Sequence, residues 1–99
     1  MTIEKTTNGA NITLKIIGRL DTTTAPQLEA AVDNDVAGAT DLTLDMEALE
    51  YVSSAGLRVI LKAQKLMNSA NGSMKLTNVN SIIMEVFDIT GFTDILTIE

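Results

Sequence analysis

Two adjacent hydroxyl side chains, Ser53 and Ser54, stand where a loop meets the start of a predicted helix. The first backbone N–H groups of a helix have no partner inside it, and with the helix dipole they favour a negative charge. Gly56 keeps the first turn narrow, so another protein could approach the two hydroxyls closely. Serines in this position can serve as a helix cap, as a phosphate acceptor or as a catalytic nucleophile.

Nucleophilic catalysis is the role that the sequence opposes. A serine nucleophile needs an activating base, and the chain contains no histidine and no cysteine. The residues three positions after the serines are Gly56 and Leu57, so no lysine stands at the spacing of a Ser-x-x-Lys motif. We therefore predict that the protein is not an enzyme. On the residues alone, capping is the commonest role of a serine before a helix, and phosphorylation stays open.

A second polar group follows the strand that precedes the first helix. Asp21 closes the segment Gly18-Arg19-Leu20-Asp21, which would bring it to the same edge of the sheet as the serines. The simpler interpretation is that Asp21 and the threonines at positions 22–24 only cap the following helix. The spacing alone favours this capping role.

The other charged residues predict neither a metal site nor a cofactor. A loose group of carboxylates precedes the serines, at Asp41, Asp45, Glu47 and Glu50. Their spacing is not that of a calcium loop, so a solvated face is the simpler interpretation. Bases at i, i+4 and i+7 share one face of the next helix, where we expect a solvent stripe that could contribute to a partner surface: Arg58, Lys62 and Lys65.

Length and composition restrict the class of protein. The chain has 99 residues, 45% of them apolar, which predicts one globular domain over residues 1–99. Its net charge of −6 repels phosphate backbones, so nucleic acid is an unfavourable direct partner. No apolar run reaches the roughly 18 residues that a membrane span needs, and the first residues do not have the pattern of a signal peptide. We therefore expect a cytoplasmic protein without a membrane span.

The first half of the chain predicts a hairpin, a helix and another strand. Asn8-Gly9 favours a tight turn, between an edge strand around Ile3 and an alternating strand over residues 12–16. Pro26 suits the first turn of a helix that starts near Ala25 and ends around residues 35–38. Alternation over residues 42–44 predicts an internal strand, and residues 47–52 are expected to form a connection.

The second half predicts two more helices and a short strand. A long apolar helix starts near Ser54 and ends near Asn71-Gly72, and a strand follows over residues 74–77. Apolar residues at helical spacing predict an amphipathic helix from about Asn80 to Gly91, with an extended tail or last strand after it. The order predicts an α/β fold, with a mixed sheet of four or five strands opened by an antiparallel hairpin and three to four helices.

Three blocks of the sequence together resemble a known family. They are Gly18-Arg19-Leu20-Asp21, the segment from Leu44-Asp45 through Ser53-Ser54-Ala55-Gly56-Leu57, and Leu76 with Phe87-Asp88-Ile89-Thr90-Gly91-Phe92. In their order and spacing these blocks resemble STAS domains of the anti-sigma factor antagonist type. The resemblance implies the STAS fold and a small regulator without enzymatic activity. It also implies that the unphosphorylated protein binds an anti-sigma factor, usually a serine kinase, and that a PP2C-type phosphatase reverses the phosphorylation.

Position by position, the resemblance makes Ser54 the phosphate acceptor, with Ser53 as the alternative. The sequence departs from the family where Ser53 replaces an aspartate and Ala55 replaces a serine or threonine. The implied partner-binding residues surround this position: Asp21, Thr22, Ser53, Ser54, Ala55, Gly56 and Arg58. The alternative function is a STAS docking subunit of a transporter or larger signalling assembly that is not phosphorylated.

Overall fold

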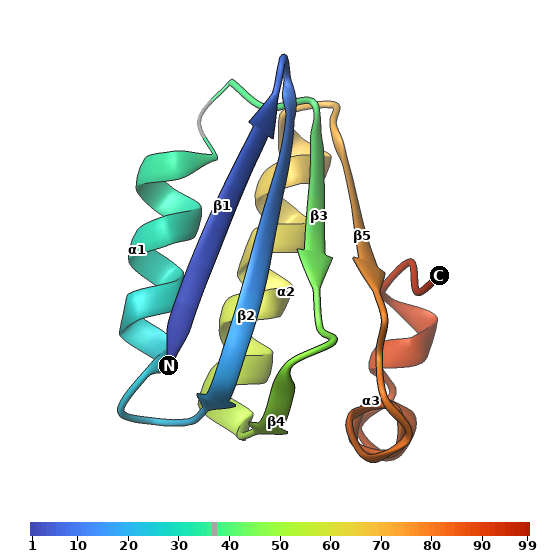
Figure 1. Cartoon of the computed structure of the whole chain (residues 1–99). Helices are drawn as coiled ribbons and strands as arrows, with labels where there is room; N and C mark the ends of the chain where they lie inside the picture. Colours follow the sequence, from blue (N-terminus) through green and yellow to red (C-terminus); the bar gives the residue numbers. More distant parts are fainter. Residues whose placement is uncertain (37) are drawn as a thin grey trace.

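A computed structural model describes residues 1–36 and 38–99, in which strands and helices alternate along the chain. The elements are β1 (Thr2–Asn8), β2 (Asn11–Leu20), α1 (Ala25–Asp35), β3 (Asp41–Asp45), β4 (Leu49–Val52), α2 (Ser54–Ser69), β5 (Ser73–Thr77) and α3 (Ser81–Thr90), as Figure 1 shows. The predicted α/β class, the mixed sheet and the three helix starts are confirmed. The predicted end of the first helix includes residue 37, which lies outside the described residues, and α1 itself ends at Asp35.

The sheet has the strand order β1-β2-β3-β5, and β4 also pairs with β2. β1 and β2 form the antiparallel hairpin that Asn8-Gly9 predicts, and β2, β3 and β5 run parallel to one another. Parallel neighbours need a crossover connection, and α1 and α2 supply these crossovers.

The connection predicted over residues 47–52 is wrong, because Leu49–Val52 forms β4. β2 changes partner along its length: residues 11–15 pair with β3, and residues 18–20 pair with β4, with an irregularity between Gly18 and Arg19. In β4 the two end residues are buried and the two middle residues are exposed. This strand therefore lacks the alternation from which strands are recognised in a sequence.

One face of the sheet carries the core. α1 and α2 lie side by side against it (Figure 1), and alternate strand residues are buried beneath them. The side chains that are almost wholly inaccessible are aliphatic apart from one phenylalanine: Leu14, Ile16, Leu20, Leu28, Leu42, Leu44, Met46, Leu49, Ile60, Met67, Leu76 and Phe87. On the opposite face Lys15 lies between Glu4 and Asp45 on the neighbouring strands, so that face alternates in charge.

α3 and the C-terminal tail lie on the β5 side of the sheet (Figure 1). The Asn80 side chain accepts a hydrogen bond from the Ile83 amide at 2.9 Å, and it donates one to the Leu49 carbonyl at 3.0 Å. Asn80 therefore caps α3 and ties its start to β4. The tail forms a 3₁₀ turn over Phe92–Asp94 and then one parallel bridge between Ile98 and Leu76, so the predicted last strand is reduced to that bridge.

Candidate functional site

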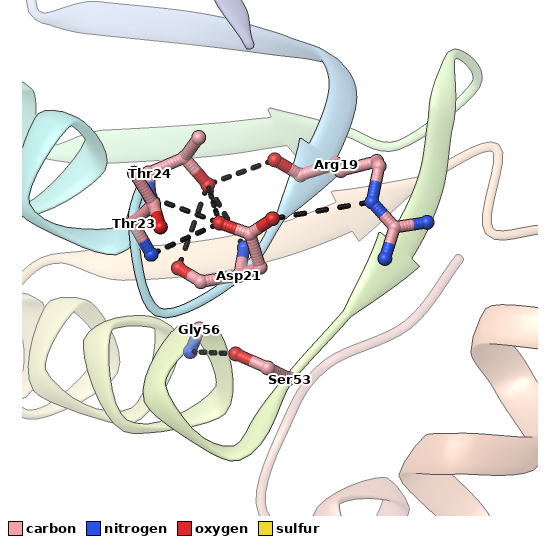
Figure 2. Close-up of polar contacts among 6 residues, drawn as sticks. All are labelled: Arg19, Asp21, Thr23, Thr24, Ser53 and Gly56. Carbon is pink, nitrogen blue, oxygen red and sulfur yellow. Dashed lines mark hydrogen bonds and ion pairs between the residues drawn. The ribbon is translucent and has the colours of Figure 1, made fainter.

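The ends of β2 and β4 bring the two predicted polar segments together. Leu20 and Val52 are paired in the sheet, and the Ser53 amide donates a hydrogen bond to the Leu20 carbonyl at 2.9 Å. The loop over residues 21–24 and the first turn of α2 therefore start from neighbouring positions (Figure 2). Asp21 and the serines therefore lie at a common edge of the sheet, as the sequence predicts.

The two serines occupy different positions at the start of α2. Ser53 is the N-cap, and its hydroxyl oxygen accepts a hydrogen bond from the Gly56 amide at 3.3 Å (Figure 2). Ser54 is the first residue of the helix and is exposed, whereas Ser53 is half-buried. Capping therefore belongs to Ser53, and the Ser54 side chain is accessible to another protein.

Gly56 lets α2 pack closely on the sheet. A Cβ atom at this position would lie 2.6 Å from Leu20 Cγ and 3.0 Å from Val52 Cγ2. Both side chains are buried in the core, and neither contact is compatible with ordinary packing. Gly56 is buried as well, so it supports the site from beneath instead of contacting a partner directly.

Asp21 organises the loop that faces α2. Its Oδ1 accepts hydrogen bonds from the Thr24 amide at 3.1 Å and from the Thr23 amide at 3.0 Å, and the Thr24 hydroxyl donates to the Arg19 carbonyl at 2.8 Å (Figure 2). The Thr24 amide, helped by the Thr24 hydroxyl, the Thr23 amide and the positive charge of Arg19, lowers the pKa of Asp21. Asp21 is therefore an ionised, oriented carboxylate at the same edge of the sheet as the serines.

The loop geometry corrects the predicted role of the threonines. Thr24 is the N-cap of α1 by position, but its side chain makes no cap hydrogen bond to the helix. Instead, Thr24 Oγ1 accepts a bond from the Asp21 amide at 2.8 Å and so closes the turn against Asp21. Thr22 is exposed at the tip of this loop.

A pair that sequence reasoning missed flanks the same edge. The Arg19 guanidinium lies 4.3 Å from the centre of the Tyr51 ring, and Arg19 Nε lies 3.9 Å from Asp21 Oδ2. Arg19 and Tyr51 are paired residues of β2 and β4. Recognising this pair in the sequence would have required recognising β4.

The predicted basic stripe on α2 is only partly correct. Lys62 forms ion pairs with Asp33 at 3.1 Å and Glu29 at 3.2 Å, and these carboxylates raise its pKa. Lys62 thus links α2 to α1 instead of facing solvent alone. Arg58 and Lys65 are exposed as predicted, and Arg58 lies one turn after Ser54.

The predicted acidic group is spread over two ends of a strand. Asp41 accepts a hydrogen bond from Ser73 at 2.6 Å at the start of β3, and Asp45 accepts one from Asn78 at 3.1 Å at its end. Among the side chains that the structure describes, histidine, cysteine and carboxylate groups form no cluster suited to a metal ion. Over the same residues, every helix is too short or too polar to cross a membrane.

The start of α2 favours a negative charge, as the N-terminus of any helix does. Its first turn contains no acidic residue. The partial positive charge of the helix N-terminus therefore has no carboxylate partner in that turn. A negative group attached to Ser54 would meet the helix end where negative charge is favoured.

A family model described as the STAS domain matches residues 2–99. The chain belongs to the STAS domain family. The anti-sigma-B factor antagonist of Bacillus subtilis is 32% identical to this STAS domain over 91 residues, which are 92% of this chain and 84% of that protein. The family predicted from the three sequence blocks is therefore confirmed.

Solved structures show the same fold. An anti-sigma factor antagonist from Mycobacterium paratuberculosis has a TM-score of 0.87 at 21% identity, and the match covers 98% of this STAS domain and 83% of that chain. The Bacillus cell fate determinant SpoIIAA in its phosphorylated form has a TM-score of 0.77 at 17% identity, with coverage of 99% and 91%. These similarities confirm the predicted STAS fold.

Proposed function

We propose that this STAS domain is an anti-sigma factor antagonist whose binding to an anti-sigma factor is switched off by phosphorylation of Ser54. The observation that carries the proposal is the exposed Ser54 hydroxyl at the first position of α2, at the same edge of the sheet as the oriented carboxylate of Asp21. The Bacillus subtilis relative is named for the same function. In this function the domain acts by binding and carries out no catalysis.

The positions of the two hydroxyls favour Ser54 over Ser53 as the acceptor. A kinase must reach the hydroxyl, and Ser54 is exposed while Ser53 is half-buried. The Ser53 oxygen also accepts the Gly56 amide, so phosphorylating Ser53 would disturb the cap. A phosphate on Ser54 leaves this hydrogen bond in place.

The charge of the phosphate explains how the switch works without refolding. Phosphoserine carries a charge of about −1.5 to −2 and three acceptor oxygens. The helix N-terminus stabilises that charge within the domain, whereas a partner surface fitted to a neutral hydroxyl does not accommodate it. The expected partner surface is formed by the accessible residues around the acceptor: Asp21, Thr22, Ser53, Ala55 and Arg58.

The proposed partners follow from this switch. The anti-sigma factor would itself be the serine kinase, and a PP2C-type phosphatase would restore the binding form. The protein would act in the cytoplasm, with no direct contact to nucleic acid.

The test is to incubate the domain with its cognate anti-sigma kinase and ATP and to map the phosphate by mass spectrometry. We expect phosphate on Ser54 in the wild-type protein and in Ser53→Ala, and none in Ser54→Ala. Phosphate on Ser53 would reverse the assignment of the two serines. If a kinase that is active on a control antagonist modifies neither serine, the proposal fails, and a docking subunit that is not phosphorylated becomes the better function.

A further inference from the structure

A groove whose lining does not include Ser54 lies between the β2–β4 edge and the start of α3. It has a volume of about 570 Å³, and its apolar lining includes Ile17, Leu49 and Ile82. Ile82 is 67% exposed, and a contiguous exposed apolar surface of this kind can mark an interaction site. The groove is therefore an apolar surface open to solvent.

The exposed apolar surface continues along α3. Ile82 and Ile89 stand seven residues apart, which places them on one face of the helix, while Val86 between them is half-buried and packs against the core. Ile89 is 78% exposed, while Ile83 and Phe87 on the adjoining face are fully buried. The core is thus completed without Ile82 and Ile89, and packing within the domain does not explain these two exposed isoleucines.

The charged residues that line the groove are of one sign. The described residues that line the groove include Glu47 and Glu50 and no lysine or arginine. α3 itself adds Glu85 and Asp88, and the last base of the sequence is Lys75. An apolar strip flanked by carboxylates is complementary to aliphatic side chains flanked by lysine or arginine.

We propose that this groove and the exposed isoleucines of α3, Ile82 and Ile89, dock a basic, amphipathic segment of a partner protein, independently of the Ser54 switch. Aliphatic side chains of that segment would enter the groove, and its bases would pair with Glu47 and Glu50. A second copy of the chain fits less well because each copy carries a net charge of −6. Nucleic acid and anionic membranes are repelled by the same carboxylates.

The test uses a synthetic helical peptide of leucine and lysine, with leucines at i, i+3, i+4 and i+7, added to unphosphorylated protein without any kinase. Backbone amide NMR should show shifts confined to the groove and α3, over residues 17–18, 47–50 and 80–89. A matched peptide with serine in place of leucine keeps the charge and should not produce this pattern. Shifts spread over the whole acidic surface, or equal binding of both peptides, would overturn the proposal.

Three variants distinguish binding of the peptide in the groove from non-specific electrostatic attraction of a basic peptide to an acidic protein. Ile82→Ser should weaken peptide binding by about tenfold or more, since it removes most of one buried isoleucine contact. The double variant Glu47→Lys/Glu50→Lys should weaken it as well. Ile95→Ser changes a residue that is 49% exposed and outside the groove lining, so it should bind like wild type.

Two further measurements test whether the groove acts independently of Ser54 and whether a second copy of the chain occupies it. Ser54→Ala should bind the peptide like the wild type, so a failure of the Ser54 switch and a failure of the groove are told apart. Sedimentation should show a monomer at the concentrations used. A dimer that Ile82→Ser abolishes would identify a second copy as the occupant and overturn the proposed foreign partner.

Discussion

At the scale of single residues, the adjacent serines differ in what their hydroxyls contact. The Ser53 oxygen accepts the Gly56 amide, whereas Ser54 faces solvent. Loss of a serine N-cap costs about 1 kcal/mol, and substitution of an exposed residue usually changes stability by less than about 0.5 kcal/mol. We predict that Ser53→Ala lowers the free energy of unfolding by about 1 kcal/mol and that Ser54→Ala leaves it nearly unchanged. Urea unfolding measures both; equal losses would contradict the assigned cap.

Gly56 offers a test of the close approach between α2 and β2. A methyl group there would lie 2.6 Å from Leu20 Cγ, and overpacking of this kind costs about 1–3 kcal/mol. Alanine is the better helix former by up to about 1 kcal/mol, which offsets only part of this cost. We therefore expect a net loss of stability in Gly56→Ala. The loss should shrink in a Leu20→Ala background, which removes the contacted atoms. An additive double variant would show that Leu20 is not the obstacle.

Asp21 gives the protein a defined dependence on pH. The Thr24 and Thr23 amides lower its pKa in the folded state below the ordinary 3.8. A lowered pKa stabilises the fold above the ordinary value, and this contribution is lost as the pH falls through the folded-state value. Asp21→Asn keeps an oxygen acceptor but cannot titrate. We predict that its stability deficit relative to wild type is largest near neutral pH and shrinks below about pH 3.8; a deficit independent of pH would contradict the hydrogen-bond assignment.

At the scale of elements, α3 packs on the core through one face. Phe87 is fully buried and stacks on Phe92 with ring centres 6.4 Å apart, while Ile89 on the same helix is 78% exposed. Truncating a buried phenylalanine costs about 3–5 kcal/mol. We predict a loss of that size for Phe87→Ala and a change below about 0.5 kcal/mol for Ile89→Ala, both by guanidinium unfolding. Similar midpoints for the two variants would contradict the described packing of α3.

The sequence was sufficient for the elements that have a clear period or a strong terminal signal. The helix starts at Ala25 and Ser54 followed from Pro26 and the paired serines, and the helix that starts at Ser81 followed from the helical spacing of its apolar residues. β4 could not be predicted because a four-residue strand buried only at its ends has no alternation. The change of partner along β2 depends on pairing between distant segments, which local patterns do not contain.

The sequence predicted that the candidate site residues lie at one edge of the sheet, but it did not predict which of the two serines caps α2. The pattern located Ser53, Ser54 and Asp21 at one edge, since each follows a parallel strand. Which serine caps the helix depends on backbone angles at the end of β4, an element the pattern did not show. The contact between Arg19 and Tyr51 could not be predicted either, because Tyr51 lies in β4.

At the scale of the whole molecule, one sheet supports two separate surfaces. The Ser54 edge is formed where β2 and β4 pass into α1 and α2, and the apolar groove is formed between β2, β4 and α3. A phosphate at the first edge is stabilised by the helix end and requires no change in the core. We therefore predict that the phosphorylated protein gives nearly the same circular dichroism spectrum as the unmodified one. Loss of helical signal on phosphorylation would mean that the switch acts by unfolding.

The most direct test of the proposed switch compares the affinities of the unmodified and Ser54-phosphorylated domains for the same anti-sigma factor, by calorimetry without ATP. Unfavourable charge in a fitted interface costs several kcal/mol, so we predict that phosphorylation weakens binding by at least about 100-fold. Ser54→Ala should bind like the unmodified protein, and Ser54→Asp, with one added charge, should lie between the two. Equal affinities of the phosphorylated and unmodified domains would contradict the proposed function.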